Sequence, residues 1–353
     1  MDAILISQKQ NLNRLRDFLR GIKLHHDLLK IDTDIIQDRL IKKNLEKHNR
    51  FYLNIKTEKA LLDYTTVTVN LYSSFEQFIE GMIMAYLSHI NNIIPKFNEL
   101  PDNIKKVHSN LSAQLLLNLH LQKYHGITTE NDIIHNLYTC TKNLSGYKLN
   151  TLAFAHHSSN FRVNSINEIF SHVIDGSISQ MIKLQKIFKN YINKLDPALD
   201  LNRTKNDVIF EQINDLAYRR NEISHGAPSQ ILSIQLLEER IDFIDVYCQS
   251  MHDAVIAKIL PFIVAYKASH LSNIITIINH NIICAEVENI TVSVGDTIIS
   301  KSSHNRYRHS KIESIEVDNE SFEKIDAKQK VEIGMKVNFY AKDNHEFFHS
   351  SLN

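Results

Sequence analysis

The stretch YRRNEISHG, residues 218–226, decides how the rest of the chain is interpreted. Apolar residues precede and follow its arginines at helical spacing and predict one apolar stripe: Ile209, Ile213, Leu216 and Ile223. Arg220 falls in the middle of this stripe, where its guanidinium needs a partner because it cannot lose its charge. We therefore expect that Arg220 pairs internally, or that the stripe opens onto a cleft or a subunit interface.

The end of the same helix is marked by local signals. Gly226 and Pro228 predict that the helix stops, since glycine favours a helix C-cap and proline cannot continue the helix. His225 then lies at the helix C-terminus, where the helix dipole favours a positive charge. An imidazole in this place can exchange a proton near neutral pH.

Arg220-Asn221, three intervening residues and His225 resemble the signature of HEPN-domain ribonucleases. The likeness is to the RiboL-PSP-type HEPN branch, which is common in bacterial defence and toxin systems. The stretch LYSSFEQFI, residues 71–79, is similar to an early core helix of this branch. The resemblance implies a helical bundle that cleaves RNA without a metal ion or another cofactor.

The resemblance also implies roles for individual residues. Arg220 supplies a fixed charge for the phosphorane-like transition state, and His225 takes or gives a proton. Asn221 orients the imidazole or the phosphate. Glu76 and Arg219 are candidate supporting residues, although an ordinary solvent-facing role is the main alternative for Glu76.

The spacing of the motif raises a geometric question. On an ideal helix, residues five apart differ by about 140° around the axis, so Arg220 and His225 do not converge unless the helix end unwinds or a second subunit contributes. HEPN domains form dimers with a composite cleft, and the resemblance therefore implies a homodimer. Its other implied partners are an RNA substrate, with tRNA among the candidates, and an inhibitory or defence-system protein.

Bulk composition predicts a mainly α chain of more than one domain. The chain has 353 residues, of which only 8 are Gly and 5 are Pro, and this favours helices over loop-rich β structure. We predict an N-terminal helical arm (1–60), a HEPN-like helical domain (61–275) and a small β-barrel domain (276–353). Lys and Arg total 40, as do Asp and Glu, which argues against broad non-specific binding of nucleic acid.

Several helices are predicted from apolar periodicity. The strongest covers 61–90, and others cover about 8–60, 104–125, 131–144, 165–174, 178–195 and the long segment from the motif to Pro261. Residues 1–50 carry eleven basic and seven acidic side chains. We expect a solvated helical hairpin here rather than an RNA-steering arm, because charges on helix surfaces mostly serve solvation.

The C-terminal part changes to strand periodicity at about residue 276, and five or six short strands predict the β-barrel. The segments 294–296 and 333–337 weakly resemble turns of the second-domain barrel of translation factors. A basic loop between strands includes five candidate RNA-binding residues: Lys301, Arg306, Tyr307, Arg308 and Lys311. An exposed hairpin tip is an equally good interpretation of this loop.

Other classes of site are not predicted. Cys140, Cys248 and Cys284 are too far apart for a disulfide framework or a zinc finger, and they suit a reducing cytoplasm. No signal peptide or membrane span is expected. The neighbouring His156 and His157 make a poor metal pair, and we predict a catalytic role for neither. His345 and His349 lack a third ligand and are expected at the surface.

Three functional interpretations remain open at this point. An endoribonuclease is favoured by the complete Arg220, Asn221 and His225 set. A non-catalytic HEPN scaffold would use the same helix end to dimerise or to bind a nucleotide. An RNA-binding adaptor would depend mainly on the C-terminal barrel.

Overall fold

The computed structural model describes residues 1–226, 228 and 230–351. The chain divides into two compact units. The first consists of Met1–Ala85, Lys106–Asn118 and Thr151–Ala254. The second consists of Tyr86–Lys105, Leu119–Asn150 and Val255–Asn353. The predicted domain boundaries at residues 60 and 275 stay predictions.

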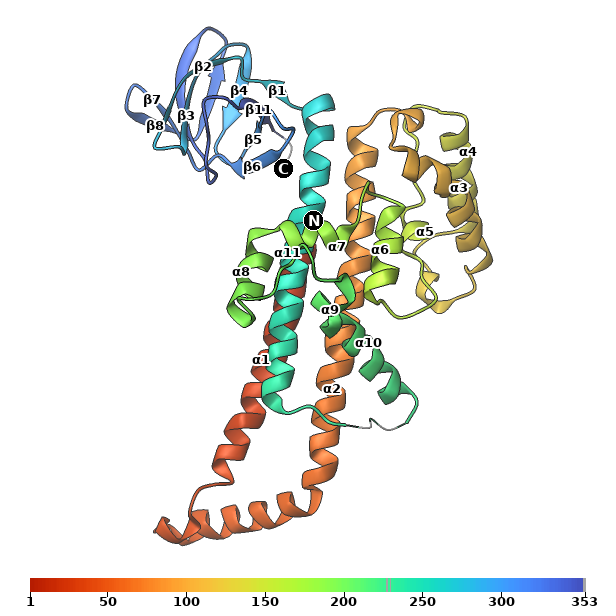
Figure 1. Cartoon of the computed structure of the whole chain (residues 1–353), viewed down its shortest axis with the longest axis vertical. Helices are drawn as coiled ribbons and strands as arrows, with labels where there is room; N and C mark the ends of the chain where they lie inside the picture. The colour runs from red at the N-terminus through yellow and green to blue at the C-terminus, as the bar shows by residue number, and fades with distance from the viewer. Residues whose placement is uncertain (227, 229, 352–353) are drawn as a thin grey trace. The chain divides into compact units, whose positions relative to one another are not determined.

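The fold is mainly α, as predicted (Figure 1). The helices are α1 (Asp2–Leu28), α2 (Arg39–Ile93), α3 (Asp102–Leu117), α4 (Glu130–Thr141), α5 (Thr151–Ala155), α6 (Val163–Ser171), α7 (Ile178–Leu184), α8 (Lys186–Leu195), α9 (Asn206–Ile209), α10 (Glu211–Ser224) and α11 (Ile234–Tyr266). Short 3₁₀ turns lie at Thr33–Ile35, Phe97–Glu99 and Gln122–Tyr124.

Helix α1 lies antiparallel to the first part of α11 (Figure 1). Arg16 forms ion pairs with Asp242 at 2.8 Å and with Asp245 at 2.9 Å. Lys23 reaches Glu238, seven residues before Asp245. Basic residues of α1 therefore form ion pairs with acidic residues of α11. This agrees with an N-terminal hairpin that packs on the rest of the helices.

Helix α2 is a single helix of 55 residues. The sequence predicted one helical region over 8–60 and another over 61–90, whereas the break falls earlier, between α1 and α2. Residues 39–93 contain no proline, so nothing interrupts the backbone hydrogen bonds at residue 60. The predicted apolar face is buried, with exposed fractions of 2% or less for Leu71, Phe75, Phe78 and Met82.

Two predicted helices are each divided in the structure. The region 178–195 breaks at Gln185, whose φ of −67° and ψ of 137° are extended. The helix leading to the motif breaks at Phe210, which separates α9 from α10. Phe210 is fully buried against Phe188, with ring centroids 5.3 Å apart. The apolar period continues across both breaks, so periodicity alone could not reveal them.

The C-terminal strands form antiparallel sheets, as expected for a small β domain. They are β1 (Ser269–His270), β2 (Asn273–Ile278), β3 (Ile282–Val287), β4 (Ile290–Ser293), β5 (Thr297–Lys301), β6 (Tyr307–Lys311), β7 (Ser314–Val317), β8 (Glu320–Phe322), β9 (Lys324–Ala327), β10 (Val331–Lys336) and β11 (Glu346–Ser350). The sheet orders are β1-β11-β5-β6, β2-β3-β10-β7-β8 and β4-β9. Each order is linear, so the strands of residues 269–350 do not close into a hydrogen-bonded barrel.

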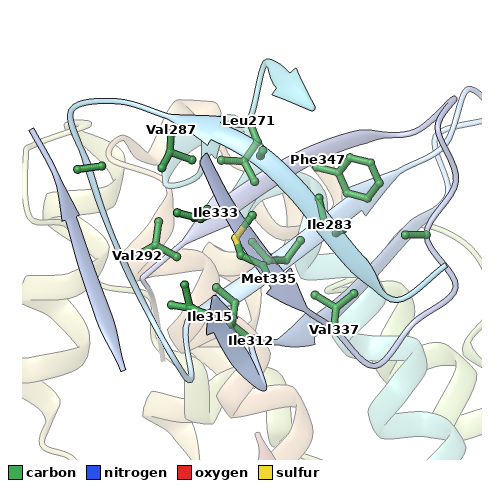
Figure 2. Packing of buried hydrophobic residues seen from close by; sticks show 14 residues of the cluster. Leu271, Ile283, Val287, Val292, Ile312, Ile315, Ile333, Met335, Val337 and Phe347 are labelled. Carbon is green, nitrogen blue, oxygen red and sulfur yellow. The ribbon is translucent and has the colours of Figure 1, made fainter. Parts of the chain in front are cut away.

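Two tight hairpins and one core organise this β region. Asn279 and His280 between β2 and β3, and Asp318 and Asn319 between β7 and β8, have positive φ. Between β7 and β8 the pair forms a two-residue turn whose twist matches that of the strands. Between β2 and β3, Ile278 pairs with Ile282, so this turn has three residues. Figure 2 shows the shared core between the sheets, which includes Ile283, Ile333, Met335 and Phe347.

The prediction that His345 and His349 are both surface residues is wrong for His349. Its side chain is 4% exposed, and its Nε2 lies 2.8 Å from Oδ2 of Asp296. His345 instead bonds Ser300 through Nδ1 at 2.7 Å. His349 is part of β11, whereas His345 lies in the bend just before it, and the two side chains meet different partners.

Candidate active site

Helix α10 carries the motif and ends where the sequence predicted. Its buried side chains are Ile213, Leu216 and Ala217. His225 forms the C-cap, and its backbone N–H donates to the carbonyl of Asn221 at 3.0 Å. Gly226 follows with a φ of 128°, which side-chain-bearing residues rarely adopt. The backbone of His225 therefore lies just beyond the last helical turn.

Arg220 is half-buried and lies against an aromatic ring of α2. Its guanidinium carbon is 5.6 Å from the centroid of the Tyr72 ring, which is within the range of a cation–π interaction. Among residues 1–226, 228 and 230–351, no carboxylate forms an ion pair with Arg220. The ring accounts for a charge on the apolar stripe and leaves that charge available to an anionic ligand.

Tyr72 connects this arginine to two other parts of the site. The side chain is 1% exposed; its hydroxyl donates to Oε1 of Glu76 at 3.2 Å and accepts from the Phe161 N–H at 2.8 Å. Burial raises the pKa of Tyr72, and the Glu76 carboxylate raises it further. The ring therefore stays a neutral phenol under Arg220. Glu76 reaches Arg220 only through Tyr72.

Arg219, the other candidate supporting residue, makes several contacts inside the fold. Its Nε donates to Asp215 at 2.8 Å, and its Nη1 donates to the Tyr64 hydroxyl at 3.3 Å and to the Gln230 carbonyl at 3.1 Å. Asp215 also pairs with Arg240 at 2.8 Å. These contacts tie α10 to α2 and α11, so Arg219 holds the motif helix in place.

Asn221 lines a polar cleft of about 760 Å³. The side-chain amide of Asn160 donates to Oδ1 of Asn221, which fixes the orientation of the Asn221 side chain. The remaining lining is polar and includes Arg162, Asn164, Asp207, Asn214 and Tyr218. A cleft of this size and polarity suits a sugar and a phosphate better than an apolar ligand.

The third motif residue stands apart from the other two. The His225 side chain is exposed, and in the part of the chain that the structure describes it makes no hydrogen bond or ring contact. Within one chain, Arg220 contacts the Tyr72 ring and Asn221 accepts a hydrogen bond from Asn160. Among the described residues, neither Arg220 nor Asn221 contacts the His225 imidazole.

A different histidine, for which the sequence predicted no role, lies beside the site. His157 Nε2 is 3.0 Å from Oε1 of Glu80 and 3.8 Å from Oε1 of Glu76. A signal for this contact exists in the sequence. Tyr72, Glu76 and Glu80 recur every four residues and share one side of α2, where two neighbouring carboxylates need a cation.

The candidate RNA-binding loop lies on β5 and β6 and the turn between them. Lys301 pairs with Glu346 at 2.7 Å, and Arg308 donates to the Tyr340 carbonyl at 3.4 Å. The exposed side chains are Arg306, Arg308 and Lys311, whereas Lys301 and Tyr307 are half-buried. Part of the predicted positive surface is therefore already neutralised within the β region.

Two further features bear on the kind of site. Among the described residues, no three His, Cys, Asp or Glu side chains lie close enough together to hold a metal ion. Helix α11 is long and apolar enough to cross a membrane, and 44% of its most apolar stretch is buried inside the protein. A single helix of this kind is weak evidence for a membrane span, because core helices can have the same length and composition.

Comparison with known proteins assigns the family. No curated protein matches the chain. The family model described as RiboL-PSP-HEPN matches residues 27–257, which is more than half of the chain and includes α2, α10 and the motif. The chain therefore belongs to the RiboL-PSP-HEPN family.

Proposed function

We propose that this protein is a metal-independent endoribonuclease whose chemistry is carried by Arg220, Asn221 and His225. Membership of the HEPN family supports a nuclease or an RNA-binding scaffold in general. The observation that carries the finer proposal is Arg220, a half-buried cation on an aromatic ring with no carboxylate partner among the described residues. It lies next to Asn221, which lines a polar cleft.

The proposed reaction is an in-line displacement at phosphorus. The ribose 2′-oxygen attacks the adjacent phosphorus, the bond from phosphorus to the 5′-oxygen breaks, and 2′,3′-cyclic phosphate and 5′-hydroxyl ends result. One proton leaves the 2′-hydroxyl and one reaches the 5′-oxygen, and His225 performs one of these transfers. Arg220 stabilises the charge that develops on the phosphorus oxygens. Asn221, whose side-chain Oδ1 accepts from Asn160, positions a neighbouring group with its side-chain NH₂.

The proposal includes a homodimer with a composite cleft. The His225 imidazole has no partner in its own chain among the described residues and does not contact Arg220. A second copy related by a twofold axis can bring its own His225 to Arg220 of the first copy. The cellular role that we propose is antiviral defence or a toxin system, with a second protein that restrains the activity.

The direct test is cleavage of labelled RNA by the full-length protein in excess EDTA. We expect 2′,3′-cyclic phosphate ends, a loss of roughly 10²- to 10⁴-fold in His225→Ala and a loss of about 10²- to 10³-fold in Arg220→Ala. His135→Ala and Arg203→Ala are matched controls, because both side chains are exposed and far from the motif in sequence. Loss of activity on chelation, or full activity in His225→Ala, contradicts the proposal.

Mixing the two inactive variants tests the composite cleft. If Arg220 and His225 come from different subunits, mixed dimers regain one intact site, and about a quarter of the wild-type activity returns after subunit exchange. If both residues act within one chain, the mixture stays inactive. A protein that is monomeric at micromolar concentration and still cleaves RNA also excludes the composite cleft.

A second candidate function is a non-catalytic HEPN scaffold that binds a nucleotide or a second copy at the same helix end. The separation of His225 from Arg220 within one chain favours this alternative. It predicts binding of RNA or nucleotide by wild type that weakens in Arg220→Ala, together with the absence of cleavage in every condition.

A further inference from the structure

The two ring nitrogens of His157 both face oxygen atoms of the protein. Nε2 lies 3.0 Å from Oε1 of Glu80, and Nδ1 lies 2.8 Å from the carbonyl oxygen of Ser159. The side chain is only 16% exposed. A carboxylate and a carbonyl can only accept hydrogen bonds, so both contacts are satisfied at once only when both nitrogens carry protons. The geometry thus calls for an imidazolium.

The charges around His157 favour the same protonation state. Glu76 and Glu80 are four residues apart on α2, where like charges repel, and an imidazolium beside both offsets this repulsion. Burial lowers the pKa of His157, but the hydrogen bonds to Glu80 and Ser159 and the two carboxylate charges outweigh burial and raise it. Other titratable groups near this position are Tyr72 and Arg220 on one side, and His156, Glu168 and His172 along a cavity of about 440 Å³ on the other.

The segment that contains His157, residues 156–162, forms hydrogen bonds with both α2 and the motif helix α10. The Phe161 N–H donates to the Tyr72 hydroxyl on α2. The Asn160 amide donates to Asn221 on α10, and the Val163 N–H just beyond the segment donates to Asn214 at 3.1 Å. His157 is thus an anchor on α2 for a segment whose next residues hold α10.

We propose that the His157 imidazolium is a positioning residue of this site, which fixes the 156–162 segment on α2 and thereby keeps Asn160 against Asn221. His157 exchanges no proton with a substrate, because protein oxygens occupy both ring nitrogens. The expected effect of His157 on RNA cleavage rests on the proposed function. The expected effect of His157 on the position of the 156–162 segment is independent of the proposed function.

The proposal has a defined pH dependence. A histidine whose pKa is raised in the folded state contributes stability that is complete below the ordinary value of 6.5 and is lost as the pH rises through the raised value. The 156–162 segment should therefore loosen on the alkaline side. Removing the Glu80 charge should move this loosening to lower pH.

The test uses the full-length protein without RNA and the variants His157→Gln and Glu80→Gln. His172→Gln is the matched control, since His172 lines the same cavity but lies outside the anchor. We expect the NMR titration of His157 to move to lower pH in Glu80→Gln and to stay unchanged in His172→Gln. Hydrogen exchange at Phe161 should accelerate roughly ten- to hundredfold in His157→Gln, as for loss of a hydrogen bond to a charged group. Unchanged exchange in His157→Gln, or an unchanged titration in Glu80→Gln, overturns the proposal.

A cleavage assay separates this proposal from the proposed function. If wild type cleaves RNA, His157→Gln should lower kcat more than it changes KM, and Glu80→Gln should shift the alkaline limb of kcat to lower pH. A wild-type kcat in His157→Gln overturns the positioning role. If no protein cleaves RNA, the proposed function fails, while the titration and exchange measurements still decide whether His157 is the anchor.

Discussion

At the scale of single residues, two neighbouring arginines of α10 have opposite surroundings. Arg219 donates to Asp215, Tyr64 and Gln230. Arg220 has an aromatic ring beneath it and no ion pair among the described residues. The sequence made Arg220 a catalytic candidate and Arg219 only a supporting one, but it could not show which groups either side chain contacts. Their contacts support a structural role for Arg219 and are compatible with the ligand-binding role that we propose for Arg220.

This contrast gives a prediction about stability. Arg219→Ala should lower the free energy of unfolding by about 1–3 kcal/mol, because it removes hydrogen bonds to a charged partner and to the buried Tyr64 hydroxyl. Arg220→Ala should lower it by about 1 kcal/mol, the size of a cation–π contact in which the guanidinium is only partly desolvated. Urea unfolding of both variants checks the difference. Equal losses would show that the ring contact stabilises the fold as much as the Asp215 network does.

At the scale of elements, the end of α10 depends on the backbone of Gly226. An added Cβ meets no atom within 4 Å, so the cost of a side chain there comes from the φ of 128° alone. Gly226→Ala should therefore cost about 1–3 kcal/mol of backbone strain. Part of this strain can be relieved by moving His225, so RNA cleavage should fall by more than the stability change explains. Cleavage rates and urea unfolding of the same variant test this, with Gly21→Ala in α1 as a control without positive φ.

The end of α10 was predictable from sequence, whereas the contacts around the motif were not. Glycine and proline act on their immediate neighbours, so Gly226 and Pro228 reveal the end of the helix without knowledge of the fold. Tyr72 meets Arg220 across almost 150 residues, and Glu80 meets His157 across 77. Such pairs depend on how α2, the 156–162 segment and α10 pack together. The spacing of Glu76 and Glu80 indicates that a cation is needed on this side of α2, but nothing local identifies His157 rather than His156 as that cation.

At the scale of the whole molecule, helices and strands have different proposed tasks. We expect the helical part to carry the chemistry and the basic loop of the β region to add affinity for RNA. Replacing Arg306, Arg308 and Lys311 with Gln should raise the RNA concentration needed for half-maximal cleavage and reduce the salt dependence by about one unit or less per lost contact. The rate at saturating RNA should stay near wild type.

The matched control for this loop is the same change of charge elsewhere in the β region, at Lys324, Lys328 and Lys330, which are all exposed. Equal effects of the two triple substitutions would indicate a general electrostatic contribution rather than a binding loop. Loss of turnover at saturating RNA in the loop variant would contradict the division of tasks between helices and strands.

Because α2 is unbroken, the site restricts which sequence changes this helix can accept during evolution. Tyr72, Glu76 and Glu80 follow one another every four residues on a helix that continues without interruption on both sides. Each residue added to a helix turns everything beyond it by about 100°. One inserted or deleted residue between Tyr72 and Glu76 would leave the helix intact but rotate both carboxylates away from His157 while the ring stayed under Arg220. The site is thus sensitive to the phase of α2, and this stretch should tolerate substitutions far better than changes of length.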